Sequence, residues 1–133
     1  MVGNRSSRFV KLSHSDFLIE YAEEDVRGRT VLTTDGDRIG SVDDLLIDRE
    51  DQKVRFLEVG TGGFLGLGER KSLIPIEVVS QVDEDHVVVD QSREHVAAAP
   101  IYNPHVVQTE PYLSDVYEHY GFPPPWVPGA ETR

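Results

Sequence analysis

Short runs of β-branched and apolar residues, separated by turn residues, dominate residues 26–90 of the chain. The run Thr30–Thr33 is followed by Asp35-Gly36, a dipeptide that tolerates the positive φ angles of tight hairpin turns. A second strand is expected from about Arg38 to Ile47, but its apolar positions do not keep one strict alternation. One extra residue near Asp43-Asp44 would restore the inward face of both halves, so the pattern predicts a β-bulge there.

Further apolar runs predict more strands and a second hairpin. Val54–Val59 has the composition of a strand, and Ser72–Ile76 contains a proline that ends a strand or keeps it at a sheet edge. Glu77–Val82 and His86–Asp90 flank an acidic turn at residues 83–85. About five or six short strands of this kind, with no convincing helical period among them, predict a mainly β fold built as a small barrel or sandwich.

Residues 60–68 contain five glycines, and we expect an irregular loop over the whole stretch. Large apolar side chains within this loop need cover from a neighbouring surface, which makes Phe64, Leu65 and Leu67 candidate interaction residues. The glycines expected to serve the backbone in this loop and in the first hairpin are Gly36, Gly40, Gly62, Gly63 and Gly66.

The two ends of the chain show different patterns. Residues 1–15 are polar and predict an exposed leader, while residues 16–25 fit either a short helix or an edge strand. Thr109 is a suitable N-cap for a helix over residues 110–120, and Gly121 is a suitable stop. The prolines at 123–125 predict an extended segment, and the chain from Trp126 onward has no periodicity and is expected to be a tail.

The expected C-terminal helix has one apolar face that can be covered in two ways. The face is formed by Tyr112, Leu113, Val116, Tyr117 and Tyr120. We favour packing on the outside of the barrel, where the face would complete the core. The alternative is docking into a groove on a second chain, and then Tyr112, Tyr117 and Tyr120 would be interaction residues.

The charge balance narrows the classes of partner. The 133 residues include 24 acidic and 13 basic side chains, for a formal net charge of −11. A negative charge of this size opposes a phosphate backbone or an anionic bilayer, so we expect neither nucleic-acid binding nor direct membrane insertion. No apolar run approaches the roughly 20 residues that span a bilayer, and no secretory signal is recognisable. We therefore expect a cytoplasmic protein.

Signals for catalysis, cofactors or metals are weak. Thr61-Gly62-x-x-x-Gly66-x-Gly68 matches a dinucleotide-binding glycine pattern, but a proline-containing strand is expected after it instead of a pyrophosphate-binding helix. The five histidines have no short metal-ligand spacing, cysteine is absent, and no nucleophile elbow is present. We expect no catalytic residue, no metal and no cofactor. A cluster of carboxylates without EF-hand spacing is expected in turns and on outward strand positions: Asp35, Asp37, Asp43, Asp44, Asp48, Glu50 and Asp51.

Several blocks of the sequence together resemble PRC-barrel domains. The first is Val26-Arg27-Gly28-Arg29 with residues 35–48, and the later blocks are residues 56–59, 62–66, 73–76 and 90–96. The resemblance covers about residues 26–102 and implies a small, partly open β-barrel, similar to the cytoplasmic domain of the photosynthetic reaction centre H subunit. The family pattern contains no catalytic residue, so the resemblance implies a binding module.

These expectations divide the chain into three parts: a leader over residues 1–25, a PRC-barrel domain over 26–99, and an aromatic helix with a proline-rich tail over 100–133. The expected function is a non-catalytic protein-interaction module, an adaptor that associates with a second copy of itself as a homodimer. The alternative is a sensor of a small ligand or cation that uses the acidic face at residues 35–51.

Overall fold

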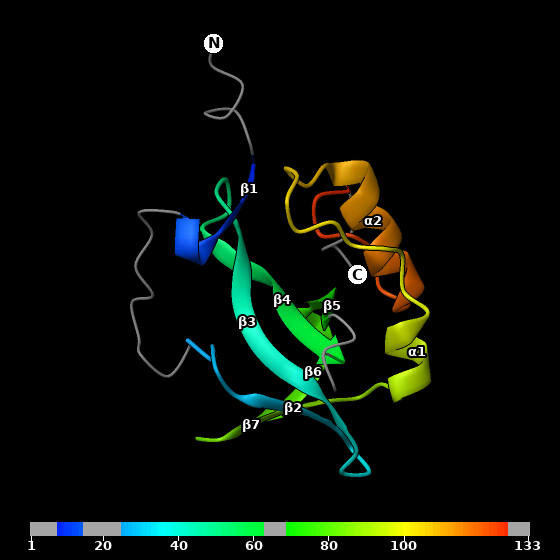
Figure 1. The fold of residues 1–133 in the computed structure, drawn as a ribbon. Coiled ribbons are helices and arrows are strands. Elements are labelled where there is room, and N and C mark those ends of the chain that lie inside the picture. The colour runs from blue at the N-terminus through cyan, green and yellow to red at the C-terminus, as the bar shows by residue number, and fades with distance from the viewer. Residues whose placement is uncertain (1–7, 15–24, 63–68, 128–133) are drawn as a thin grey trace.

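The computed structural model describes residues 8–14, 25–62 and 69–127 (Figure 1). In this part of the chain a single open sheet contains seven strands, in the order β5-β4-β3-β2-β7-β6, with β1 paired to β3 beside this path. The strands are β1 (Phe9–Lys11), β2 (Thr30–Thr33), β3 (Arg38–Asp48), β4 (Lys53–Gly62), β5 (Glu69–Pro75), β6 (Val79–Val82) and β7 (His86–Val89). The α-helices are α1 (Arg93–Ala97) and α2 (Glu110–His119), and the 3-10 helices are η2 (Leu12–His14) and η5 (Ile76–Val78). The mainly β, partly open fold expected from the sequence is confirmed.

The β2–β3 hairpin forms as its turn residues predict. Gly36 has a φ of +91°, which an L residue rarely adopts. The Thr33 hydroxyl accepts hydrogen bonds from the backbone N–H groups of Asp35 and Asp37, at 3.2 and 3.0 Å. The residues of the turn itself therefore supply the contacts and the backbone freedom that this turn requires.

The predicted β-bulge in β3 is confirmed. Val42 pairs with Val59 and Asp44 pairs with Glu58, so Asp43 is an extra residue in β3. Apolar residues on both sides of the bulge are buried: Ile39, Val42, Leu45 and Ile47. A second register shift between Leu46 and Ile47 leaves Arg55 as an extra residue in β4.

β3 is long enough to pair with three strands. β4 pairs with β3 from Ser41 to Asp48. The other edge of β3 is shared, because β2 occupies its first part and β1 pairs with Leu46–Asp48. Phe9 of β1 is 4% exposed and Leu12 is 6% exposed. The exposed leader expected over residues 1–15 is therefore wrong for residues 9–12, because Phe9–Lys11 pair with the sheet and Phe9 and Leu12 fill part of the core.

The glycine-rich stretch is more regular at its start than the composition suggests. β4 continues through Gly60 to Gly62, where Gly60 pairs with Lys71 and Gly62 with Glu69. The expected loop is therefore shortened at this end, and residues 63–68 lie outside the described residues. A strand, β5, follows this stretch and ends at Pro75, as the sequence predicts.

Gly40 of β3 leaves no room for a side chain beside β4, because a Cβ atom there would be 2.0 Å from the Gly60 carbonyl oxygen. We expect Gly40→Ala to lower the free energy of unfolding by about 3 kcal/mol, the upper end of the usual cost of overpacking, since the obstructing atom belongs to the backbone. Urea denaturation followed by circular dichroism measures the change.

The control for this prediction is Gly28→Ala. Gly28 has a φ of +91° but no atom within 4 Å of its Cβ position, so strain alone should cost about 1 kcal/mol. A larger loss of stability in Gly28→Ala than in Gly40→Ala would contradict the close approach of the two strands.

The C-terminal helix begins and ends where the sequence predicts. The Thr109 side chain accepts a hydrogen bond from the Tyr112 N–H, and Gly121 has a φ of +86°. The helix α1 was not expected, and Ser92 caps it by accepting a hydrogen bond from the His95 N–H at 3.0 Å. Figure 1 shows α1 and α2 on the same side of the curved sheet.

The segment after α2 is packed and is not a free tail as far as it is described. The Trp126 ring contacts the rings of Phe9 and Tyr117 edge to face, with centroids 5.1 and 5.4 Å apart. Its indole N–H donates a hydrogen bond to the Ser114 Oγ at 3.0 Å. The expectation of an unstructured tail is therefore wrong at Trp126, because the indole packs between segments from the two ends of the chain.

Candidate interaction site

The interaction residues expected from the sequence belong to two segments, the glycine-rich stretch and α2. Phe64, Leu65 and Leu67 lie outside the described residues. Tyr117 is fully buried and Tyr120 is 5% exposed, whereas Tyr112 is only half-buried. The apolar face of α2 is therefore packed on the chain's own sheet, which is the favoured of the two alternatives.

Tyr117 shows how closely α2 joins the sheet. Its ring lies edge to face against Phe56 of β4, with centroids 5.2 Å apart. Its hydroxyl donates a hydrogen bond to Glu77 Oε1 at 2.7 Å. Burial, followed by this hydrogen bond to a carboxylate, raises the pKa of the Tyr117 phenol well above its usual range. The phenol is consequently an uncharged part of the core.

A groove of about 860 Å³ lies between the start of β5 and the segment that runs from α1 to residue 105. Sequence reasoning did not predict it, because its two walls are brought together only by the fold. β5 contributes Arg70, Lys71 and Ser72. The other wall has apolar residues from α1 and the following segment: Val96, Ala97, Ala99, Pro100, Ile101 and Pro104.

A buried polar cluster supports the groove from below. Tyr102, which lines the groove, donates a hydrogen bond to Glu58 Oε1 at 2.6 Å. Glu58 is 5% exposed, and the Lys11 ammonium lies 3.1 Å from the same carboxylate oxygen. Lys71 pairs with Asp43 and lies 3.9 Å from the second oxygen of Glu58. Burial and then the Glu58 carboxylate raise the pKa of Tyr102 well above its usual range.

The charges on the rim of the groove are mainly positive. Arg70, Lys71 and Arg93 line it, and Glu94 is the one carboxylate among the described residues of its lining. In the part of the chain that the structure describes, the guanidinium groups of Arg70 and Arg93 form no hydrogen bond or ion pair. A cationic rim is unusual on a chain with a formal net charge of −11.

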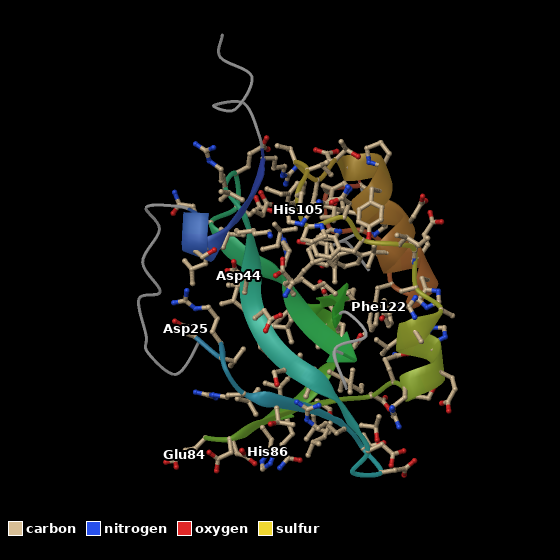
Figure 2. The ribbon with its side chains drawn as sticks, in the orientation of Figure 1. Asp25, Asp44, Glu84, His86, His105 and Phe122 are labelled. Atoms are coloured by element: carbon tan, nitrogen blue, oxygen red, sulfur yellow. The ribbon has the colours of Figure 1, made fainter. Side chains whose placement is uncertain are left out.

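Most of the carboxylates between residues 35 and 51 are exposed, as the sequence predicts, but two of them are buried. Asp44 is 5% exposed and accepts hydrogen bonds from the Ser13 hydroxyl and from the Leu45 N–H. Figure 2 shows Asp44 on β3 well away from Glu84 in the β6–β7 turn. Among the described residues, no three histidine or acidic side chains are placed to hold a metal ion. The prediction that these carboxylates all occupy turns and outward positions is wrong for Asp44 and Asp48.

Asp48 is the most buried of these carboxylates, with no exposed surface. Arg8 donates two hydrogen bonds to it, both 2.8 Å long, and the backbone N–H groups of Glu50 and Asp51 add two more. The guanidinium of Arg55, the extra residue of β4, lies 3.6 Å from Asp48 Oδ2. Burial alone would raise the pKa of Asp48, but the hydrogen bonds from Arg8 and the backbone outweigh it, so the pKa is lowered. The ionised Asp48 thus joins β1 to the β3–β4 turn.

Two histidines that look unrelated in the sequence form a pair between α1 and α2. The rings of His95 and His119 are stacked with centroids 4.0 Å apart. The Nε2 atom of each ring lies within hydrogen-bond distance of the other residue's backbone carbonyl, at 2.9 and 2.7 Å. The edge of the Tyr120 ring contacts both rings. This arrangement fixes α1 against the end of α2.

The open seven-stranded sheet, with two short α-helices packed beside it, defines a small, partly open β-barrel module. The family model of the PRC-barrel domain matches residues 18–96. The chain belongs to the PRC-barrel family. Neither described α-helix is long and apolar enough to cross a membrane.

Proposed function

We propose that this PRC-barrel protein is a non-catalytic interaction module, an adaptor that binds another protein. The observation that carries the proposal is the groove beside β5, because a concave surface with apolar walls and a polar rim is the usual form of a recognition site. Ile101, on the wall of this groove, is 88% exposed. A partner that covered it would remove apolar surface from water and so favour the complex.

The proposal that the module is non-catalytic is supported by the contacts of its buried carboxylates. Asp44, Asp48 and Glu58 each accept hydrogen bonds or pair with cations of the chain itself. A carboxylate engaged in this way stabilises the fold and is not free to take a proton from a substrate. The contacts of Asp44 and Asp48 also make these two carboxylates unavailable to the alternative, a cation sensor at residues 35–51.

Affinity capture tests the adaptor proposal. The tagged full chain is used to capture proteins from its native host, and mass spectrometry identifies them. We expect a defined protein to be retained reproducibly by the wild-type chain. Turnover of a small molecule without any captured protein would contradict the proposal.

Self-association is the second part of the proposed function, and we assign it to the apolar residues of the glycine-rich stretch. We expect the double variant Phe64→Ser/Leu65→Ser to shift a dimer toward monomer, because it removes apolar area from the contact, while its circular dichroism stays unchanged. Light scattering over a range of concentrations measures the mass. If the double variant remains a dimer, these residues are not the interface. We also propose that the protein acts in the cytoplasm.

A further inference from the structure

We propose that the groove beside β5 binds an acidic, extended segment of a partner protein, with Arg70 and Arg93 pairing with its carboxylates. This inference rests on the proposed adaptor function and assigns it a site and a class of ligand. Three properties of the groove carry it: two guanidinium groups that have no partner among the described residues, an apolar wall, and an accessible stretch of an edge strand.

The two arginines differ from others in the described chain. Arg8, Arg27 and Arg55 each donate hydrogen bonds to aspartates, at distances between 2.6 and 2.8 Å. Arg70 and Arg93 come from opposite walls of the groove and have no such partner among the described residues. A guanidinium presents a planar fork of donors that fits a carboxylate well. Two such groups across one groove are therefore suited to a ligand with acidic residues at separate positions.

The apolar wall explains why the ligand should be a peptide. The same groove is lined by small or apolar side chains, and Ile101 is the most exposed large hydrophobic residue of the described chain, at 88%. A peptide can supply an apolar side chain to cover Ile101 and carboxylates to reach Arg70 and Arg93. Nucleic acid fits less well, because its phosphates would meet the whole chain's net charge of −11.

The backbone of β5 favours an extended ligand. β5 lies at one end of the sheet order and pairs only with β4 in the described part of the chain. Its second half is buried at Leu73 and Ile74, whereas Arg70 is exposed and Ser72 is half-buried. A ligand can therefore approach the first half of β5, where an edge strand offers backbone hydrogen-bonding groups.

The overall negative charge does not prevent an acidic ligand from binding at this site. Charges separated by more than about 8 Å are largely screened at physiological ionic strength. Among the described residues that line the groove, Arg70, Lys71 and Arg93 are cationic and Glu94 is the one acid, while Asp43 and Glu58 are already engaged with Lys71. Recognition thus depends on local pairing and not on long-range attraction.

The test uses a random 12-residue peptide library displayed on phage and the intact chain as bait. Enriched peptides are synthesised with a fluorescent label, and fluorescence anisotropy measures their affinity for the wild-type chain and two double variants. Arg70→Glu/Arg93→Glu reverses the groove charges. Arg38→Glu/Lys53→Glu makes the same change of net charge at exposed positions outside the groove.

We expect the enriched peptides to carry at least two acidic residues beside an apolar one. Their affinity should fall about tenfold or more in Arg70→Glu/Arg93→Glu and change by less than about twofold in the control, since close charge pairs govern the complex. The neutral variant Arg70→Gln/Arg93→Gln should show an intermediate loss. Thermal melts identify any variant that is unfolded, and the neutral variant then supplies the comparison.

Four results would overturn the inference. They are the absence of enriched peptides, enrichment of peptides without acidic residues, equal binding to both charge-reversed variants, and tighter binding of a labelled 12-nucleotide single strand that depends on Arg70 and Arg93.

Affinity capture with the same variants distinguishes failure of the groove assignment from failure of the adaptor proposal. If Arg70→Glu/Arg93→Glu captures the same partner as the wild-type chain, only the groove assignment is wrong. If the wild-type chain captures no protein, the adaptor function itself is wrong.

Discussion

Replacing Asp48 with alanine should lower the free energy of unfolding by about 3 kcal/mol at pH 7, near the lower end of the cost of breaking a buried ion pair. The reason is that Asp48 is fully buried and accepts two hydrogen bonds from the Arg8 guanidinium. Arg8 keeps weaker contacts with Glu50 and Glu110 after the change, which limits the loss. Urea denaturation monitored by tryptophan fluorescence measures the effect, because Trp126 lies beside Arg8.

Asp51→Ala is the matched control. Asp51 lies on the same turn and pairs with Arg55 at 2.7 Å, but its side chain is 45% exposed. An exposed pair of this kind contributes less than about 1 kcal/mol. If Asp48→Ala is too unstable to purify, Asp48→Asn keeps the side-chain volume while it removes the charge and one of the two acceptor oxygens. Equal stability of the Asp48 and Asp51 variants would contradict the structural role of Asp48.

The effect of Asp48 should also depend on pH in a defined direction. The pKa of Asp48 is lowered in the folded chain, so the unfolded chain takes up the proton at higher pH than the folded chain does. The stabilisation is therefore complete above the ordinary aspartate pKa of about 3.9 and is lost as the pH falls through the lower folded value. The difference between wild type and Asp48→Asn should persist at about pH 5 and shrink below about pH 4. A difference that grew as the pH fell would contradict this sign.

Tyr117→Ala should have an effect of similar size, a loss of about 3–5 kcal/mol from the free energy of unfolding. The change would leave a cavity where the ring now contacts Phe56 and Trp126, in a site with no exposed surface. Tyr117→Phe should cost only about 1 kcal/mol, because it removes the hydrogen bond to Glu77, which is exposed and can bind water instead. Chemical denaturation of the purified variants gives both values.

The Tyr117 variants also distinguish the two readings of the C-terminal helix. If α2 served mainly to dock on a second chain, Tyr117→Ala would weaken association and leave the stability of the single chain unchanged. Tyr112→Ala, on the same helix but half-buried, should lower stability less than Tyr117→Ala does.

The parts of the fold that were predictable from the sequence are those with local signals. The first hairpin depends on Gly36 and the Thr33 hydroxyl, which lie within a few residues of each other. The helix α2 has its own cap at Thr109 and its own stop at Gly121. The β-bulge was predictable because it interrupts an alternation that burial otherwise requires.

The missed parts depend on contacts between distant segments. β1 has three residues, too few for a periodic pattern, and its position follows from the free half of an edge of β3. The stacked pair of His95 and His119 joins residues whose spacing in the sequence carries no recognised signal. The groove also could not be predicted from the sequence, because Arg70 and Arg93 line the same groove only once the fold has brought β5 and α1 together.

The sharing of one edge of β3 by β2 and β1 has a practical consequence for anyone who trims this protein. A fragment cut at residues 18 and 96, the limits of the family match, would lose Phe9, Tyr117 and Trp126 together. Phe56 would then face water, and the second half of the β3 edge would be left without a neighbour. Such a fragment would have an unpaired strand edge beside exposed apolar surface, a combination that promotes aggregation during expression. Shortened versions intended for crystallisation or interaction screens should therefore retain residues 8–127.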